Sequence, residues 1–198
     1  MRRLTRGTVT ALAMPALLIA VTAATAAPLL HLDGTVDFCL TADAARNLNS
    51  EGITMQPAGD AKSDPDRPNC VILPFTGATL ATDLSGGGAD LEGGIAFTRQ
   101  SSDLKLTNIH IDITHATITA DSSSRHASRS AVPVLAYTDG ADHTSITPTG
   151  ARATDVPLLL TPTGQSIFTS AFGTYPGPAP LFNASSESHL ATSLPHLP

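Results

Sequence analysis

Short segments in which apolar and polar residues alternate make up most of the chain, and this pattern is typical of β-strands with one buried face. Clear alternation or short apolar runs occur in the segments 35–40, 70–75, 94–98, 104–112, 117–120, 132–137, 145–148 and 156–160. Turns rich in glycine, proline and aspartate separate these segments, as expected for antiparallel strands. We therefore predict a mainly β fold, in the form of an antiparallel two-sheet sandwich.

Two segments have the spacing of short amphipathic helices instead. The first covers residues 42–50, with Thr41 as its N-cap and Gly52 just beyond its end. The second covers residues 162–172, and Gly173 supplies its stop. Each helix follows a Leu-Thr pair and ends at a glycine, which suggests a duplicated supersecondary element. Chance similarity in a chain rich in alanine and threonine is the alternative.

The N-terminal segment 1–26 has the three parts of a secretory signal peptide. Three arginines come first, a long apolar run follows, and Ala24, Thr25 and Ala26 form a small-residue cleavage site. We expect cleavage there, which leaves no membrane span in the mature chain. Retention of the segment as a membrane anchor is the alternative.

The residues after the leader divide into a domain and a tail. Residues 27–175 carry all the predicted strands and helices, so we assign them to one β-sandwich domain of ordinary size. Residues 176–198 are rich in proline and serine and contain few large apolar side chains. They are predicted to form a flexible tail.

Cys39 and Cys70 are the two cysteines of the chain. In an exported protein, two cysteines most simply form one intramolecular disulfide. A zinc pair is disfavoured because no second pair of ligands lies near them in the sequence. We predict a disulfide that links the strand at 35–40 to the strand at 70–75.

Charge and aromatic content argue against several classes of partner. The net charge is −6, and aromatic residues make up 4% of the chain with no tryptophan. An acidic chain is a poor ligand for nucleic acid or for an anionic membrane surface. We therefore expect no nucleic-acid partner, and we expect a cell-envelope component or a small molecule instead.

Motifs that would identify a reaction are missing from the sequence. It contains no G-x-S-x-G elbow, no phosphate-binding Walker loop and no H-E-x-x-H zinc motif. His110 and Asp112 share one face of a predicted strand, but a pair is too few ligands for a metal site, so an ordinary polar outer face is favoured. We predict no catalytic residue, no metal and no resident cofactor.

Tyr137 and His110 are the candidates for a haem site. Tyr137 ends a strongly apolar strand, and tyrosine can ligate ferric haem. We favour an ordinary position at the edge of the core as the explanation of Tyr137. The main prediction is therefore that the protein has no cofactor. Haem is the alternative, with Tyr137 and His110 as its candidate ligands.

The central part of the chain resembles a family of secreted proteins from high-GC Gram-positive bacteria, and more distantly the HtaA domain of haem-acquisition surface proteins. The resemblance covers residues 35–175 and rests on strand and turn motifs. These motifs lie at residues 93–97, 104–112, 116–120, 132–135 and 158–164. The chain lacks the tryptophan-containing opening of the haem-binding repeats and has no tyrosine in its opening strand.

Three functions follow as hypotheses from these observations. The leading one is a non-enzymatic domain, secreted or associated with the cell surface, that binds a small ligand. The resemblance implies a haem-binding HtaA-like module as the alternative. An extracellular hydrolase is the second alternative, and a cleft with buried titratable groups of shifted pKa would favour it.

Overall fold

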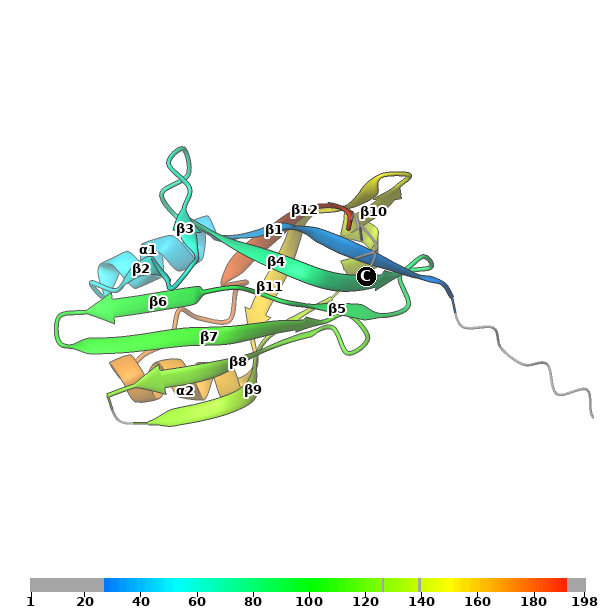
Figure 1. The fold of residues 1–198 in the computed structure, drawn as a ribbon. Helices are drawn as coiled ribbons and strands as arrows, with labels where there is room; N and C mark the ends of the chain where they lie inside the picture. The colour runs from blue at the N-terminus through cyan, green and yellow to red at the C-terminus, as the bar shows by residue number, and fades with distance from the viewer. Residues whose placement is uncertain (1–26, 126, 139, 192–198) are drawn as a thin grey trace, which may run out of the picture.

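The computed structural model describes residues 27–125, 127–138 and 140–191, so the predicted leader 1–26 lies outside the described residues. Figure 1 shows the strands and helices in this part of the chain. In chain order they are β1 (Leu29–Leu40), α1 (Ala42–Ser50), β2 (Thr54–Ala58), β3 (Lys62–Ser63), β4 (Cys70–Ala81), β5 (Gly87–Asp90), β6 (Gly94–Arg99), β7 (Ser102–Asp112), β8 (Thr117–Ser124), β9 (Ser128–Tyr137), the 3₁₀ turn η1 (Gly140–His143), β10 (Thr144–Thr147), β11 (Gly150–Leu160), α2 (Pro162–Phe172) and β12 (Phe182–Leu190).

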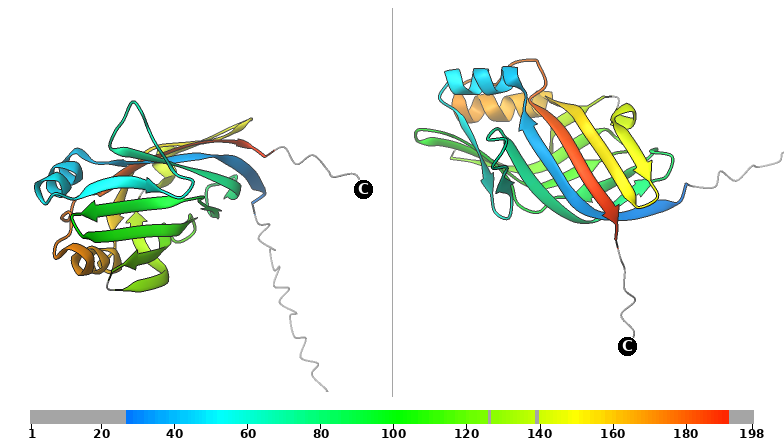
Figure 2. Two further views of the ribbon diagram at one scale, coloured as in Figure 1. Left: turned by 60° about the vertical axis from the view of Figure 1, so that its left-hand side comes forward. Right: turned by 90° about the horizontal axis from the view of Figure 1, so that it is seen from above.

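All the strands of the described residues belong to one antiparallel sheet that closes on itself. Its order is β2-β6-β7-β5-β4-β1-β12-β11-β9-β8, and β8 pairs in turn with β7, so the strands from β7 to β8 form a ring (Figure 2). The predicted mainly β fold with two short helices is confirmed, whereas the two-sheet sandwich is wrong. Alternating apolar and polar residues indicate only that each strand has one buried face. The same alternation occurs in two packed sheets and in a single sheet that closes around its own core, so it does not distinguish them.

Both helices lie at the same end of the closed sheet, which we call the helix end (Figure 2). Thr41 and Thr161 each cap a helix by accepting a hydrogen bond from the backbone N–H three residues further on. Gly173 ends α2 in the left-handed conformation, with φ of 77°. The predicted helix bounds are therefore confirmed.

No helix in the described residues has the length and apolar character needed to cross a membrane.

Aromatic rings fill the interior at the helix end. Phe38, Phe97, Phe168 and Phe182 are completely buried. The ring centroids of Phe97 and Phe168 lie 4.8 Å apart, and those of Phe38 and Phe182 lie 5.5 Å apart, in edge-to-face arrangements that aromatic pairs prefer. The first contact joins α2 to β6, and the second joins β1 to β12.

The prediction of a flexible tail at 176–198 is wrong for the residues that the structure describes. β12 lies inside the sheet between β1 and β11 and pairs with both along most of its length. Leu181 and Phe182 are fully buried. The scarcity of large apolar side chains misled the prediction, because β12 needs apolar groups only where its inner face meets the core. Residues 192–198 lie outside the described part.

The predicted disulfide between Cys39 and Cys70 is confirmed. The two residues are register partners on the neighbouring strands β1 and β4. The disulfide therefore joins the C-terminal end of β1 to the start of β4 at the helix end. Arg67 lies beside it and forms ion pairs with Asp37 and Asp64.

Candidate functional site

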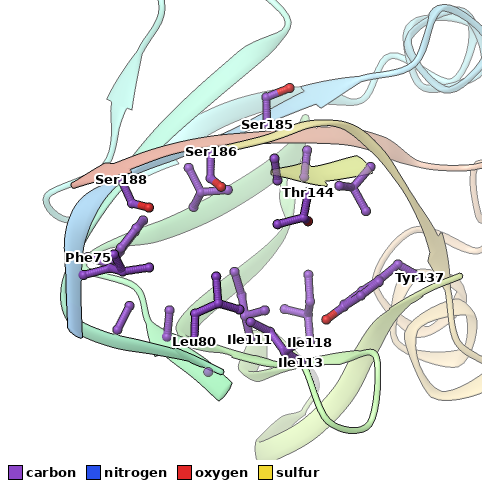
Figure 3. Close-up of a pocket in the computed structure, with 18 of the residues that line it drawn as sticks. Phe75, Leu80, Ile111, Ile113, Ile118, Tyr137, Thr144, Ser185, Ser186 and Ser188 are labelled. Atoms are coloured by element: carbon purple, nitrogen blue, oxygen red, sulfur yellow. The ribbon is translucent and has the colours of Figure 1, made fainter. Parts of the chain in front are cut away.

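A cavity of about 290 Å³ lies inside the closed sheet, away from the helices. We call this end the open end, and it is where β1 starts near Leu29 and β12 finishes near Leu190. Strands from all round the ring contribute to the cavity wall, among them β1, β4, β5, β7, β8, β9, β11 and β12 (Figure 3). Its volume lies close to the lower limit of about 300 Å³ typical of small-molecule sites.

The interior is hollow at the open end because small side chains occupy its inward positions. Ala78 on β4, Ala89 on β5 and Ala153 on β11 line the cavity. On β12 the inward side chains decrease in bulk from Phe182 at the helix end to Ser188 at the open end. Side chains of this size do not fill the space between the walls, so a cavity remains beyond the aromatic core.

The two long walls of the cavity differ in chemistry. One wall is aliphatic and is formed by Leu80, Ile111 and Ile118 from β4, β7 and β8. The hydroxyls of Ser186 and Ser188 project into the cavity from β12 on the facing wall (Figure 3). A ligand in this space meets an apolar surface on one side and hydroxyl groups on the other.

Tyr137 projects into the cavity from the end of β9 (Figure 3). Its hydroxyl donates a hydrogen bond of 3.3 Å to the carbonyl oxygen of Asp112, at the end of β7. Burial raises the pKa of Tyr137 to about 12, and the negative charge of the Asp112 carboxylate adds to the shift. The phenol is therefore neutral at physiological pH and presents an oxygen that can still accept a hydrogen bond.

None of the side chains that line the cavity, among the described residues, carries a formal charge at neutral pH. Beside the cavity, in the β7–β8 turn, Asp112 accepts hydrogen bonds from the ring and the backbone N–H of His115. These bonds lower the pKa of Asp112. The residues Ile113 and Ala116 of the same turn line the cavity, so the turn forms part of its rim.

The structure does not bring the two haem candidates together. Tyr137 lines the cavity, whereas His110 lies on the outer face of β7 and its Nδ1 is 2.7 Å from an Asp90 carboxylate oxygen. Ile111, the next residue of β7, faces the cavity instead. This arrangement follows from the two-residue period of a strand, which places neighbouring side chains on opposite faces.

No group of three or more histidine, cysteine, aspartate or glutamate side chains could hold a metal ion within residues 27–125, 127–138 and 140–191. His110 and Asp112, for which the sequence favours an ordinary polar outer face, each form a hydrogen bond with a different partner. His110 contacts Asp90, and Asp112 holds His115.

The sequence alone did not identify Ser186 and Ser188 as cavity residues. Both lie in the segment predicted to be a flexible tail, although every second residue from Phe182 to Ser188 follows the pattern of a strand. Two successive serines at inward positions weaken that signal. The positions become meaningful only once β12 is placed between β1 and β11.

Solved structures with a similar fold include two domains of one bacterial protein. The C-terminal domain of HtaA from Corynebacterium glutamicum is 16% identical in sequence, with a TM-score of 0.60 over 82% of this chain and 99% of that domain. The N-terminal domain of HtaA is 12% identical, with a TM-score of 0.51 over 85% of this chain and 100% of that domain. The heme binding protein HtaB from the same bacterium is 14% identical, with a TM-score of 0.47 over 82% of this chain and 97% of that protein.

No family model and no curated protein matches the chain in sequence. The predicted distant resemblance to HtaA domains is confirmed at the level of the fold. The chain is thus a mainly β domain with a fold like that of the HtaA domains, closed around a largely apolar cavity.

Proposed function

We propose that this protein is a non-enzymatic binding module that takes a small, largely apolar molecule into the cavity of the closed sheet. The observation that carries the proposal is a cavity of about 290 Å³ with predominantly apolar walls and a few hydroxyl groups. Small-molecule sites typically combine an apolar lining with a few polar groups that orient the ligand.

The polar groups of the cavity support binding better than hydrolysis. The hydroxyl of Ser188 donates to the carbonyl oxygen of Ala151 rather than to a general base. Tyr137 is the cavity residue with a shifted pKa, and its shift favours the neutral form. A hydrolase with a serine nucleophile needs a base within hydrogen-bonding distance of that serine.

We further propose that the domain works outside the cytoplasm, secreted or associated with the cell surface. The disulfide between Cys39 and Cys70 is the structural support, because such bonds persist in oxidising compartments. The leader-like segment 1–26 is the support from the sequence. Intact-mass analysis of the protein exported by its own host tests both, through the loss of residues 1–26 and the oxidised mass.

Binding in the cavity is tested with the neutral fluorescent probe N-phenyl-1-naphthylamine. The probe should gain fluorescence with the wild-type protein, and Ala153→Phe should abolish the gain by filling the cavity that Ala153 lines. Ala42→Phe is the matched control, because Ala42 is exposed at the start of α1 on the helix end. Equal fluorescence from both variants would exclude the cavity as the site.

Haem is the second candidate ligand, and a specific observation favours it. Tyr137 places a phenol oxygen on the wall of an apolar cavity, and tyrosine is one of the protein ligands of haem iron. The fold likeness to the C-terminal domain of HtaA adds support. Tyr137 would be the iron ligand of such a haem, because no histidine, cysteine or methionine occurs among the described cavity residues.

Haem binding through Tyr137 requires the phenol to lose its proton, and this requirement makes the affinity for haemin depend on pH. The phenol must lose its proton before its oxygen binds iron, and its pKa is raised to about 12. The affinity for haemin should therefore rise with pH across the neutral and mildly alkaline range. Haemin titration should show a Soret shift that Tyr137→Phe abolishes and that His110→Ala preserves. Loss of the shift in His110→Ala alone would place the haem on the outer face of β7.

A further inference from the structure

We infer that the cavity selects an uncharged amphiphile, a small aliphatic or cyclic body that carries a neutral hydroxyl group. This inference rests on the proposed function and specifies the chemical class of its ligand. Three features of the cavity support it: the absence of charge on its described walls, the free hydroxyl of Ser186, and the opposition of an aliphatic wall to a hydroxyl wall.

The absence of charge excludes ionised ligands from the interior. The cavity wall, as far as the structure describes it, contains neither an acidic nor a basic side chain. An ionised group moved from water into such a site loses its hydration and gains no partner of opposite charge, which costs much more than the burial of a hydroxyl. A fatty-acid carboxylate or an alkylammonium group would therefore have to remain in solvent at the open end.

The hydroxyl of Ser186 is the polar group best suited to orient a ligand. Ser186 lies on the inner face of β12, and its hydroxyl has no hydrogen-bond partner among the described residues. It points into the cavity, as does the phenol of Tyr137 (Figure 3). A ligand hydroxyl can donate to one of these oxygens and accept from Ser186, so both of its hydrogen-bonding functions can be satisfied.

The facing wall accepts the apolar body of such a ligand. Leu80, Ile111 and Ile118 form an aliphatic surface on the side of the cavity opposite the serines. Burial of an alkyl chain against them is favourable because it removes apolar surface from water. The aliphatic wall therefore suits the apolar part of an amphiphilic molecule, and the wall with the serines suits its hydroxyl group. A fully apolar or a highly polar ligand would use only one of these walls.

Three ligands with the same alkyl chain and different head groups test this selection. 1-Octanol, octanoate and octylammonium are each used to displace N-phenyl-1-naphthylamine from the full-length mature protein at pH 7.5. We expect 1-octanol to displace the probe at a concentration at least about tenfold lower than either ion, because each ion loses hydration without a partner. Displacement by octanoate or octylammonium at the same concentration as 1-octanol would overturn the inference.

Variants of Ser186 test the orientation of the ligand. Ser186→Ala should weaken 1-octanol about fivefold by removing one hydrogen bond, and it should leave the probe itself unaffected. Ser123→Ala is the control, since Ser123 is exposed on β8 near the helix end. Unchanged displacement by 1-octanol in Ser186→Ala would overturn the role of Ser186. Failure of the probe and of all three octyl ligands to bind would instead refute the proposed function itself.

Discussion

The hydroxyl of Tyr137 donates a hydrogen bond to the carbonyl oxygen of Asp112, and this bond ties the end of β9 to the end of β7 across β8. The backbone N–H of Tyr137 donates to the carbonyl oxygen of Ala116 in the same β7–β8 turn. Tyr137 therefore holds the rim of the cavity as well as forming part of its wall. The protonation of the Tyr137 phenol therefore affects both the stability of the fold and the polarity of the cavity wall.

The raised pKa of Tyr137 predicts a loss of stability at alkaline pH. In the unfolded chain the phenol ionises near its ordinary pKa of 10.0, whereas in the folded protein its pKa is about 12. The stabilising contribution of the neutral phenol is therefore fully present below pH 10 and is lost as the pH rises towards 12. Urea unfolding at several pH values should show this decline in the wild type and a flatter profile in Tyr137→Phe. Tyr175→Phe, at the surface, should retain the wild-type profile.

Removal of β12 should unfold the domain rather than trim a tail. A chain that stops after Tyr175 loses Phe182, and with it the edge-to-face contact to Phe38 and the pairing partner of both β1 and β11. Circular dichroism and thermal unfolding should show no cooperative transition in the truncated chain. A truncation after Ala191 is the control and should unfold like the wild type, and a cooperative transition in the shorter chain would show that β12 is dispensable.

The point substitution Phe182→Ala tests the same strand without changing its pairing. Phe182 is completely buried, so its removal should cost about 3–5 kcal/mol of unfolding free energy. Glu187→Ala, exposed on the outer face of β12, should change the free energy by less than about 0.5 kcal/mol. Equal denaturant midpoints for the two variants would contradict the central position of β12.

Reduction of the disulfide should lower stability without abolishing the closed sheet. The bond between Cys39 and Cys70 closes a loop with a sequence separation of 31, which corresponds to roughly 3–4 kcal/mol in the chain-entropy model. Denaturant unfolding with and without a reductant measures this contribution. The double variant Cys39→Ser/Cys70→Ser should match the reduced protein and should show no response to the reductant.

Gly164 in the first turn of α2 should not tolerate even a methyl group. A Cβ atom at this position would lie 2.3 Å from the carbonyl oxygen of Val134, on the neighbouring strand β9. Gly164→Ala should therefore destabilise the protein by about 1–3 kcal/mol, although alanine is the better helix former. Ser166→Ala, at an exposed position of the same helix, is the control. An increase in stability of Gly164→Ala would show that α2 does not pack closely on β9.

Local structure was predictable wherever neighbouring residues decide it. Thr41 and Thr161 cap the two helices, and Gly173 ends α2, because each of these roles depends on groups only a few residues away. Alternation likewise predicted the strands around Ile111 and Leu135, and the compartment rule predicted the bond between Cys39 and Cys70.

Tertiary structure alone decided how the strands close and what they enclose. The pairing of β7 with β8 and the insertion of β12 between β1 and β11 complete a ring that no local pattern specifies. The cavity then arises because Ala153 and Ser186, inconspicuous in the sequence, both face inward at one end of the ring. Alternation separates inner from outer residues, as it does for His110 and Ile111, but only the closed sheet determines which inner residues meet.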